Sequence, residues 1–309
     1  MVQQHTGARS SRWNLGTGVD SLVSYVVPAY NASRHIGELL QSVYSQTYRP
    51  IEVVIVDDGS SDNTDIVVRD FASTHNGGGL HIHIHRQENR GVSAARNEGI
   101  RLSRGSVLGY LDADDLIPPF RTTQLVQALI RNGADFVRGG IVRVYSDPEL
   151  RAAVSAGESE AIDAEEQESR LPIVDLEPMP VLSLMSRALV ERAGPWNEAL
   201  SVHVDVEYTP RLLAAARHRV QITPCVYIYR IVQGSLCAGS SETLQKGRAL
   251  HFATREIWRL HRERVLAEPK SRDALLWLTC EAARRLIRQG APREAADAYA
   301  LVGGVDDRV

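Results

Sequence analysis

Residues 51–60 read IEVVIVDDGS, and this short stretch decides the fold. Residues 51–56 form a continuous apolar run, which is typical of a β-strand buried on both faces of a parallel sheet. The run stops at Asp57 and Asp58, and helical spacing follows over residues 65–73. A buried strand that leads through a short polar loop into a helix is the repeating unit of an α/β protein.

The same alternation extends in both directions from this stretch. Further strands are predicted at residues 22–27, 81–85, 107–111, 135–145 and 220–229, the last interrupted by Pro224. Helices are predicted over residues 36–44, 93–103, 121–132, 181–193 and 208–216. We therefore expect an α/β fold in which a doubly wound, mostly parallel sheet is flanked by helices.

The C-terminal part of the chain has a different pattern. From Leu244 onward the spacing is helical, with breaks at Glu268-Pro269 and at residues 290–292, which predicts a C-terminal helical appendage of two or three helices. We expect a disordered polar leader, an α/β domain with two halves, and this appendage: residues 1–20, 21–240 (21–120 and 121–240) and 241–309. Residues 147–178 are acidic and weakly periodic, and are predicted to be a mobile loop or an insertion.

Composition narrows the class of protein. The chain has 309 residues, 43% of them hydrophobic, which is ordinary for a soluble globular protein. The formal net charge of −3 provides no global basic field for nucleic acid or an anionic membrane. The three cysteines are unclustered, which favours a reducing, cytoplasmic setting over a disulfide or zinc framework. No apolar run reaches the ~20 residues of a membrane span, and the N-terminus does not resemble a signal peptide.

Distinctive residues follow three of the predicted strands, at the edge where a parallel sheet binds its ligands. They are residues 28–31, Asp57-Asp58, and the group Asp112, Asp114 and Asp115. Carboxylates this close repel one another, and burying them is costly unless a positive group neutralises them. Oxygen ligands at a strand end suit Mg2+ or Mn2+. On these residues alone, the alternative that one Asp caps the next turn while the others are solvated stays equally open.

Three segments together resemble a known family. They are VVPAYNASRHIGELLQSVYSQTYRPIEVVIVDDGSSDNT at residues 26–64, ENRGVSAARNEGI at residues 88–100 and GYLDADDLIPP at residues 109–119. Their order and spacing resemble the nucleotide-binding half of the family-two inverting glycosyltransferases, which have the GT-A fold. The resemblance is clear over residues 21–120 and fainter to about residue 237. It implies a nucleoside-diphosphate-sugar donor, UDP-linked by default, and Mn2+ or Mg2+ as cofactor.

The resemblance also implies roles on the nucleobase side. It places Pro28 and Tyr30 beside the base, with Tyr30 as a stacking face. It gives Asp58 a hydrogen bond to the base. A plainer alternative for Asp58 is an ordinary Asx turn with a helix cap.

Five charged residues are implied to handle the sugar, the phosphates and the metal. Arg96 would lie near the phosphates, where a cation is physically sensible. Asp112 and Asp114 would bracket the sugar and the ribose. Asp115 would hold the metal most directly, with Asp114 beside it, and Arg230 would touch the diphosphate.

A later stretch, AGPWNEALSVHVDVEYTPRL at residues 193–212, resembles the acceptor side of the family. The resemblance implies that Asp205 is the general base that takes the proton of the acceptor hydroxyl, for transfer with inversion. Trp196 is implied as an acceptor-sugar platform and Glu207 as a second acceptor contact. The alternatives are that Asp205 and Glu207 form a solvated helix N-terminus, favoured by the helix dipole, and that Trp196 belongs to the core.

Two positions depart from the family pattern. Val204 stands where relatives commonly have Glu before the base. Ile231-Val232 follows Tyr229-Arg230 where relatives often have His. The first departure concerns acceptor binding, and the second concerns a metal or diphosphate ligand. They motivate a second hypothesis, a catalytically weak relative that binds a sugar nucleotide or a glycan.

Other function classes are disfavoured. The turn at residues 28–31 is not glycine-rich, which argues against a dinucleotide-dependent oxidoreductase. The Gly/Lys signature of a nucleotidyltransferase is missing near the N-terminus. A growing polysaccharide, a lipid-linked sugar and a small natural product all stay open as acceptors, and no nucleic-acid partner is expected.

Two patterns are interpreted as structural. His81, His83 and His85 alternate with isoleucine and are expected on the wet face of an edge strand. Five large apolar residues of the tail are expected to form the seam between packed helices: Trp258, Leu260, Leu276, Trp277 and Leu286. The alternative for this tail is a surface for a homodimer or for peripheral contact with the inner membrane face.

Overall fold

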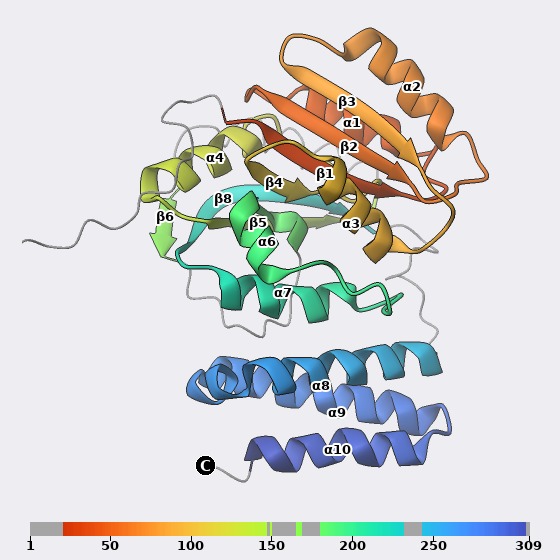
Figure 1. Cartoon of the computed structure of the whole chain (residues 1–309), viewed down its shortest axis with the longest axis vertical. Helices are drawn as coiled ribbons and strands as arrows, with labels where there is room; N and C mark the ends of the chain where they lie inside the picture. Colours follow the sequence, from red (N-terminus) through yellow and green to blue (C-terminus); the bar gives the residue numbers. More distant parts are fainter. Residues whose placement is uncertain (1–20, 147–148, 150–164, 169–179, 232–242, 307–309) are drawn as a thin grey trace, which may run out of the picture.

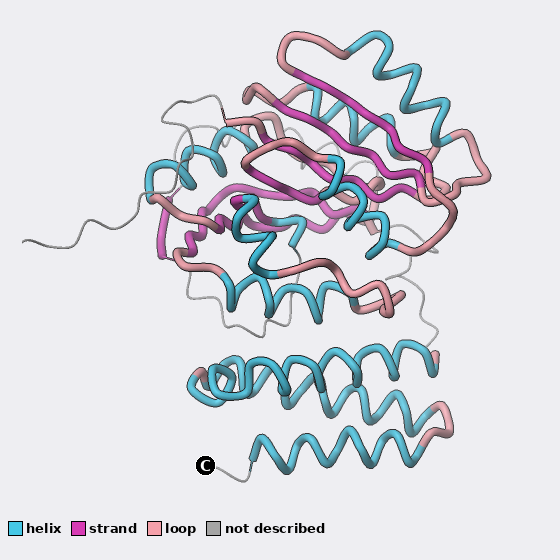
Figure 2. Tube along the Cα trace, viewed as in Figure 1, coloured by secondary structure: helices cyan, strands magenta, loops and turns pink. Residues whose placement is uncertain are grey.

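The computed structural model describes residues 21–146, 149, 165–168, 180–231 and 243–306. The predicted leader at residues 1–20 lies outside these ranges, as do most of residues 147–178. The described chain forms an α/β domain above a stack of three helices (Figure 1). Figure 2 separates strands from helices by colour and shows the sheet within the upper part.

Eight strands form one sheet in the order β3-β2-β1-β4-β7-β5-β8-β6. Their bounds are β1 Val23–Ala29, β2 Ile51–Asp57, β3 Leu80–Arg86, β4 Val107–Tyr110, β5 Phe136–Val144, β6 Glu165–Glu168, β7 Ser183–Ser186 and β8 Arg219–Arg230. The pairs β3/β2, β2/β1, β1/β4 and β5/β8 are parallel. Strand β7 runs antiparallel between β4 and β5, and β6 runs antiparallel to β8. The expected mostly parallel sheet is therefore confirmed.

Helices flank the sheet on both faces, as expected for a doubly wound fold. Their bounds are α1 Ile36–Tyr44, α2 Thr64–His75, α3 Val92–Leu102, α4 Arg121–Asn132, α6 Arg187–Ala193, α7 Val204–Ala215, α8 Leu244–Ala267, α9 Pro269–Arg288 and α10 Pro292–Asp306. Helix α3 lies in front of the sheet in Figure 1 and α1 lies behind it. Strand β2 is consequently buried at every position and β1 at all but one.

One predicted helix is wrong. Residues 181–193 were expected to be helical, but the chain forms a 3-10 turn at Pro180–Leu182, then strand β7, and only then α6. All four residues of β7 are buried between β4 and β5. A short apolar run is compatible with a strand or a helix, and here pairing with two neighbours in the sheet decides the outcome.

The predicted interruption at Pro224 is a shift of register and not a break, because strand β8 continues from Arg219 to Arg230. Strand β8 pairs with β5 on both sides of it, but the register shifts between Arg138 and Gly140. A Cβ atom on Gly139 would lie 2.2 Å from the main-chain oxygen of Cys225. The shift of register coincides with a proline, which has no N–H to donate to the ladder, and with a glycine that permits close approach.

The C-terminal helices stack below α7 (Figure 1). The predicted breaks are confirmed, because Pro269 begins α9 and Gly290, with φ 73°, separates α9 from α10. The predicted apolar seam is confirmed for three residues, buried or partly buried: Trp258, Leu276 and Leu286. It is wrong for Leu260 and Trp277, which are 45% and 50% exposed. Their faces of α8 and α9 are not covered by the described part of the chain.

The histidine strand lies where it was predicted. Strand β3 is at one edge of the sheet, and His81, His83 and His85 are exposed while Ile82 is buried. The edge-strand interpretation of these histidines is confirmed.

None of the helices in the described ranges combines the length and the apolar character needed to cross a lipid bilayer.

Candidate active site

Hydrogen bonds join the loops after β1 and β2 and thereby fix this edge of the sheet. Asn31, in the left-handed region with φ 50°, donates its N–H to Ser60 Oγ at 2.9 Å. Its Oδ1 accepts the N–H of Ser61, also at 2.9 Å. Next to it Tyr30 is 56% exposed, and Pro28 is half-buried. An open aromatic face is therefore available at the edge, and its stacking on a nucleobase stays a prediction.

Asp58 organises the loop that leads into α3. Its carboxylate is 4% exposed and accepts hydrogen bonds from Gln87 Nε2 at 2.7 Å and from the N–H groups of Arg90 and Gly91 at 2.8 Å each. Gly91, with φ 89°, is the N-cap residue of α3. Asp58 thus sets the start of the helix that carries Arg96, a contact that the sequence did not predict. Its hydrogen bond to a nucleobase stays a prediction.

Arg96 joins the two sides of the site. It is 3% exposed, its Nη2 donates to Asp112 Oδ1 at 3.0 Å, and its Nη1 donates to Asp205 Oδ1 at 3.0 Å. Burial alone would lower the pKa of Arg96, but Asp205 and Asp112 outweigh burial and raise it, so the guanidinium stays charged. The sequence predicted all three residues for this site, and the fold brings them together across 109 positions of the chain.

Asp205 lies in the first turn of α7, across Arg96 from Asp112. Burial raises the pKa of Asp205 to about 6, with the charge of Arg96 lowering it and that of Asp112 raising it. The Asp205 side chain is still 37% exposed, so the carboxylate is partly buried but accessible to solvent. A carboxylate with this pKa is mostly ionised at pH 7 and is a stronger base than an ordinary Asp.

Negative charge is incompletely balanced at the end of β4. Burial and the charge of Asp112 raise the pKa of Asp114 to about 6, opposed in part by Arg230. Burial, followed by the charges of Asp112 and Asp114, raises the pKa of Asp115 well above its usual range. A nearby cation would lower these pKa values again. The hard oxygen donors and their unbalanced charge fit Mg2+ or Mn2+.

The carboxylate of Asp115 is occupied by contacts inside the protein, which argues against its expected role as the most direct metal ligand. It is fully buried, and it accepts the N–H of Arg230 at 2.8 Å and the hydroxyl of Tyr227 at 2.7 Å. Tyr227 also accepts the N–H of Asp112 at 3.2 Å. These bonds fasten the turn after β4 to β8, which leaves half-buried Asp112 and Asp114 as the carboxylates of this turn that could hold a metal. Tyr227 was missed, although the period-two alternation of β8 could have placed it inward.

The described residues hold no ready-made cluster of three or more His, Cys, Asp or Glu side chains for a metal. An ion held by only Asp112 and Asp114 takes its remaining ligands from water and phosphate oxygens, as Mg2+ commonly does in nucleotide sites. The site therefore fits a metal that arrives with its substrate better than a resident structural ion.

Arg230 is held by the loop and helix after β1. Its Nη1 hydrogen-bonds His35 Nδ1 at 2.7 Å, and its Nη2 donates to Glu38 Oε2. Its charge lowers the pKa of Asp114, which places it close to the carboxylates. Contact with a diphosphate would require the guanidinium to share or exchange these partners, and that contact stays a prediction.

Trp196 and Glu207 are internal, which corrects both expected acceptor contacts. Trp196 is 2% exposed and its ring stacks on Tyr208 at 3.8 Å, so it has no open face for a sugar. The alternative interpretation of Trp196 as a core residue is confirmed. Glu207 is 5% exposed and forms a two-pronged ion pair with Arg211, at 2.8 Å for both bonds. Arg211 also donates to the carbonyl of Ala193 at the end of α6 and to that of Pro195 in the loop before α7, so Glu207 acts on this loop through Arg211.

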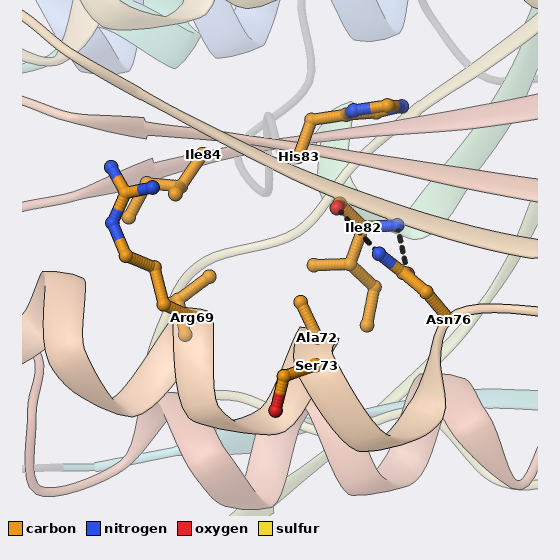
Figure 3. Close-up of a pocket in the computed structure, with 8 residues that line it drawn as sticks. Arg69, Ala72, Ser73, Asn76, Ile82, His83 and Ile84 are labelled. Atoms are coloured by element: carbon orange, nitrogen blue, oxygen red, sulfur yellow. Dashed lines mark hydrogen bonds between the residues drawn. The ribbon is translucent and has the colours of Figure 1, made fainter.

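A groove of about 420 Å³ lies elsewhere, between α2 and β3 (Figure 3). Its lining includes Val68, Ala72 and Ile82, and Asn76 closes one side. The Asn76 amide exchanges two hydrogen bonds with the main chain of Ile82, at 2.7 and 3.2 Å, and so occupies part of the free strand edge. None of the residues predicted for the site lines this groove, and we assign it no role in the chemistry.

Comparison with known sequences identifies relatives. The family model of glycosyl transferase family 2 matches residues 24–194, more than half of the chain. The chain is 32% identical over 248 residues to the succinoglycan biosynthesis protein ExoU of Rhizobium meliloti (strain 1021), covering 76% of this chain and 69% of that protein. It is 34% identical over 137 residues to the uncharacterized glycosyltransferase EpsJ of Bacillus subtilis (strain 168), covering 42% of this chain and 39% of EpsJ. The alignment with EpsJ thus spans well under half of that protein.

Solved structures share the fold. S. aureus TarS 1-349 in complex with UDP-GlcNAc superimposes with a TM-score of 0.64 at 16% identity, covering 91% of this chain and 90% of TarS. The mannosyltransferase PcManGT from Pyrobaculum calidifontis, in complex with GDP-Man and Mn2+, gives a TM-score of 0.61 at 22% identity, covering 92% and 76%. The expected GT-A fold is confirmed, and the chain belongs to glycosyl transferase family 2.

Proposed function

We propose that this protein transfers a sugar from a nucleoside-diphosphate sugar to an acceptor hydroxyl, with inversion and in a single displacement. The observation that carries the proposal is the bridge from Asp112 through Arg96 to Asp205. In this bridge, one guanidinium joins Asp112, on the proposed donor side, to Asp205, on the proposed acceptor side. In a direct displacement the base must act on the sugar face opposite the leaving diphosphate, and the bridge supports this by bringing Asp205 of a distant segment to the same site as Asp112.

The residues at the ends of β1 and β2 support a nucleoside diphosphate as the leaving group. The exposed ring of Tyr30 offers a stacking face for the base, with Pro28 and Asp58 beside it at the same edge. Asp58 retains acceptor capacity, because its two oxygens take only three intramolecular hydrogen bonds from described residues. UDP is our default nucleotide. TarS in complex with UDP-GlcNAc and PcManGT in complex with GDP-Man and Mn2+ are precedents on the same fold.

Asp112 and Asp114 would hold Mn2+ or Mg2+ together with the diphosphate. When bound, the ion supplies positive charge that stabilises the leaving diphosphate as a Lewis acid. Arg96 lies 3.0 Å from Asp112, and it keeps a cation beside the phosphates throughout the reaction. Arg230 is the second candidate for phosphate contact.

Asp205 accepts the proton of the acceptor hydroxyl in this proposal. Its Oδ1 is held by Arg96, while no described residue donates to its Oδ2. The oxygen that would receive the proton is therefore oriented without being occupied. A pKa of about 6 lets Asp205 be ionised before transfer and lets it release the proton to solvent above that pH.

For the acceptor and the cellular location we propose general classes only. A growing polysaccharide, a lipid-linked sugar and a small natural product all present a hydroxyl to this half of the site. A cytoplasmic enzyme that is peripheral to the inner membrane face, or a homodimer formed through the C-terminal helices, would use exposed apolar residues of the tail. Trp277 and Ile287 of α9, 50% and 52% exposed, and Leu260 of α8, 45% exposed, are among the residues available for either contact.

A binding and turnover screen tests the proposal. Thermal shift against UDP-, TDP- and GDP-sugars, with and without Mn2+, should reveal metal-dependent stabilisation by one nucleotide. The hit is then assayed for release of the free nucleotide, with water or candidate glycans as acceptor. A catalytically weak binding relative would show stabilisation with no turnover, and Asp205→Asn would change nothing in it. Absence of both stabilisation and turnover for every sugar nucleotide would refute the proposal.

A further inference from the structure

The C-terminal helices grip the segment that carries Asp205. Arg285 of α9 donates from Nη1 to His203 Nε2 at 3.2 Å. Val206 of α7 packs in an apolar cluster whose other members belong to α8 and α9. Asp205 therefore stands between two residues that are held by the helices of the tail.

His203 has a backbone conformation that needs such support. It is the N-cap residue of α7 with φ 56°, in the left-handed region, and its side chain makes no capping hydrogen bond. Residues other than glycine stay in this region only where their surroundings hold them. The same turn is tied a second time, because Gln245 Nε2 of α8 donates to Ser201 Oγ at 2.7 Å.

The contact with Arg285 also fixes the chemical state of His203. A guanidinium can only donate, so His203 Nε2 accepts and the ring proton lies on Nδ1. Burial, then the charges of Arg285 and Lys246, lowers the pKa of His203 to about 4. Asp205 and Glu207 are the acidic groups of the adjoining first turn. His203 is neutral at pH 7, and Arg96 is then the cation that contacts Asp205.

Arg285 is itself held in place. Glu281 accepts from its Nε at 2.9 Å, one turn earlier on α9. Gly247 of α8 faces the same point, where an added Cβ would lie 3.3 Å from Arg285 Cβ. The close approach of α8 and α9 at this glycine lets the guanidinium reach the α/β domain.

We propose that the C-terminal helices complete the acceptor side of the active site, and that Arg285 is a positioning residue that acts on Asp205 through His203. This inference rests on the proposed function, in which Asp205 is the base. It assigns the tail a task inside the reaction in addition to packing. Arg285 touches neither the donor carboxylates nor Arg96 in the described contacts, so its effect reaches the chemistry only through the start of α7.

The first test examines the contact itself in the full chain. Arg285→Met keeps the apolar stem and removes the charge, and Arg285→Lys restores a donor. Arg284→Met is the matched control, because Arg284 is the neighbouring residue on α9, is 51% exposed and pairs with Glu281 at the surface. In Arg285→Met, the NMR-monitored pKa of His203 should rise from about 4, because one of the two cations that lower it is removed while burial remains, and amide exchange over residues 201–206 should accelerate. Arg284→Met should change neither.

The second test examines the effect on the reaction. Nucleotide binding is measured by calorimetry with UDP and GDP in Mn2+, and turnover by hydrolysis of UDP-GlcNAc and GDP-mannose. Arg285→Met should lower kcat about tenfold, since displacing a reacting group by a fraction of an ångström has effects of this size. The nucleotide Kd should stay unchanged, and Arg285→Lys should recover part of the rate. His203→Asn combined with Arg285→Met should be no slower than the slower single variant, because both act through one contact.

The outcomes separate this inference from the function it rests on. If the wild-type protein neither binds nor hydrolyses any sugar nucleotide, the proposed function fails and the catalytic part of the inference fails with it. If the wild type is active but Arg285→Met leaves the His203 titration and the exchange of residues 201–206 unchanged, the inference alone is overturned. It is also overturned if those two readouts change while kcat does not, or if the two substitutions act additively.

Discussion

The donor side and the acceptor side of the site are built by different means. On the donor side, short loops at the ends of parallel strands are fastened to one another, as where Asn31 bonds Ser60 and Ser61. On the acceptor side, Asp205 lies in the first turn of α7, which follows the left-handed N-cap residue His203, and the contacts of this turn come from α3 and α9. The donor side is thus fixed by the sheet, whereas the acceptor side depends on contacts between residues far apart in sequence.

The two sides of the site also differ in the balance of their charges. The carboxylates at the end of β4 are short of positive charge, as a metal and diphosphate site should be before its ligands arrive. Asp205 instead has a cation already in place. Arg96 is the link between the two sides, and substitutions on either side should therefore have distinguishable effects on binding and on rate.

The largest effect is expected at the base. Asp205→Asn should lower kcat roughly 10²- to 10⁴-fold, the usual contribution of general base catalysis, because the amide cannot accept the acceptor proton. The nucleotide Kd should change little, since the donor side is built separately. Steady-state turnover and calorimetry with UDP in Mn2+ measure the two quantities.

The control for this substitution is Glu198→Gln. Glu198 is another carboxylate of the acceptor segment, 43% exposed, and it pairs with Arg90 on the surface. Its variant should keep wild-type kcat. Equal losses in both variants would mean that the segment as a whole had shifted, and the division between a donor side and a separate base would then be wrong.

The second effect concerns the metal and should appear on the donor side alone. Asp114→Asn removes one of the two carboxylates placed for the ion, so turnover should fall about 100-fold, since a Lewis-acid metal contributes several kcal/mol. Here the nucleotide Kd should weaken as well. A chelator should reproduce the loss in the wild type, and added Mn2+ or Mg2+ should restore it.

Chelator-treated Asp114→Asn gives the control for that experiment. The variant should lose little further activity, because both treatments remove the same ion. Full activity of chelator-treated wild type, with metal absent by elemental analysis, would contradict the proposed task of these carboxylates.

The same division explains what could be predicted from the sequence. The bounds predicted for α1 and α4 coincide with those observed, because each helix has one apolar stripe at regular spacing. Asp112 could be placed because the carboxyl ends of parallel strands share one edge of a sheet. The strand β7 could not, since its short apolar run acquires a conformation only by pairing with β4 and β5.

A second property that the sequence did not predict was the direction in which side chains point. Trp196 and Glu207 stand in a segment that resembles an acceptor site, yet a motif gives positions and not the side to which each residue points. Their surroundings are set by Tyr208, which stacks on Trp196, and by Arg211, which pairs with Glu207 one turn earlier on α7. Arg285 lies outside the segments that resemble the family, so nothing in the sequence pairs it with His203, 82 positions away.

A smaller effect is expected in the pH dependence of the rate. The base must be ionised, so with saturating metal kcat should fall as the pH drops through about 6, the pKa of Asp205. The charge of Arg96 lowers that pKa. Arg96→Gln should therefore move the acidic limb of the profile up by about one pH unit, the lower end of the effect of a neighbouring opposite charge.

Arg285→Met provides the comparison for this profile. It should lower the plateau of kcat and leave the acidic limb near its wild-type position, since Arg285 contacts His203 and not Asp205. An acidic limb that stays near 6 in Arg96→Gln would show that a different group titrates, and Asp114 would be the next candidate.

The smallest expected effects are on the free energy of unfolding. They compare the packing of α3 on the sheet with the packing between the C-terminal helices. A Cβ atom on Gly99 of α3 would lie 2.3 Å from Val26 Cγ1 in β1, so Gly99→Ala forces the helix away from the sheet. We expect a loss of about 1–3 kcal/mol in the free energy of unfolding, the usual cost of overpacking. Gly247→Ala meets its nearest neighbours, Arg285 and Leu286, at 3.3 Å.

That tail contact requires a shift of only a few tenths of an ångström, and alanine favours a helix interior over glycine by about 1 kcal/mol. The two terms nearly cancel, so Gly247→Ala should change the free energy of unfolding by less than about 1 kcal/mol. Urea denaturation followed by circular dichroism measures both variants. A larger loss for Gly247→Ala than for Gly99→Ala would mean that the tail is packed as rigidly as the sheet. The tail would then contribute to the acceptor side as part of one rigid core, and not through the single contact of Arg285.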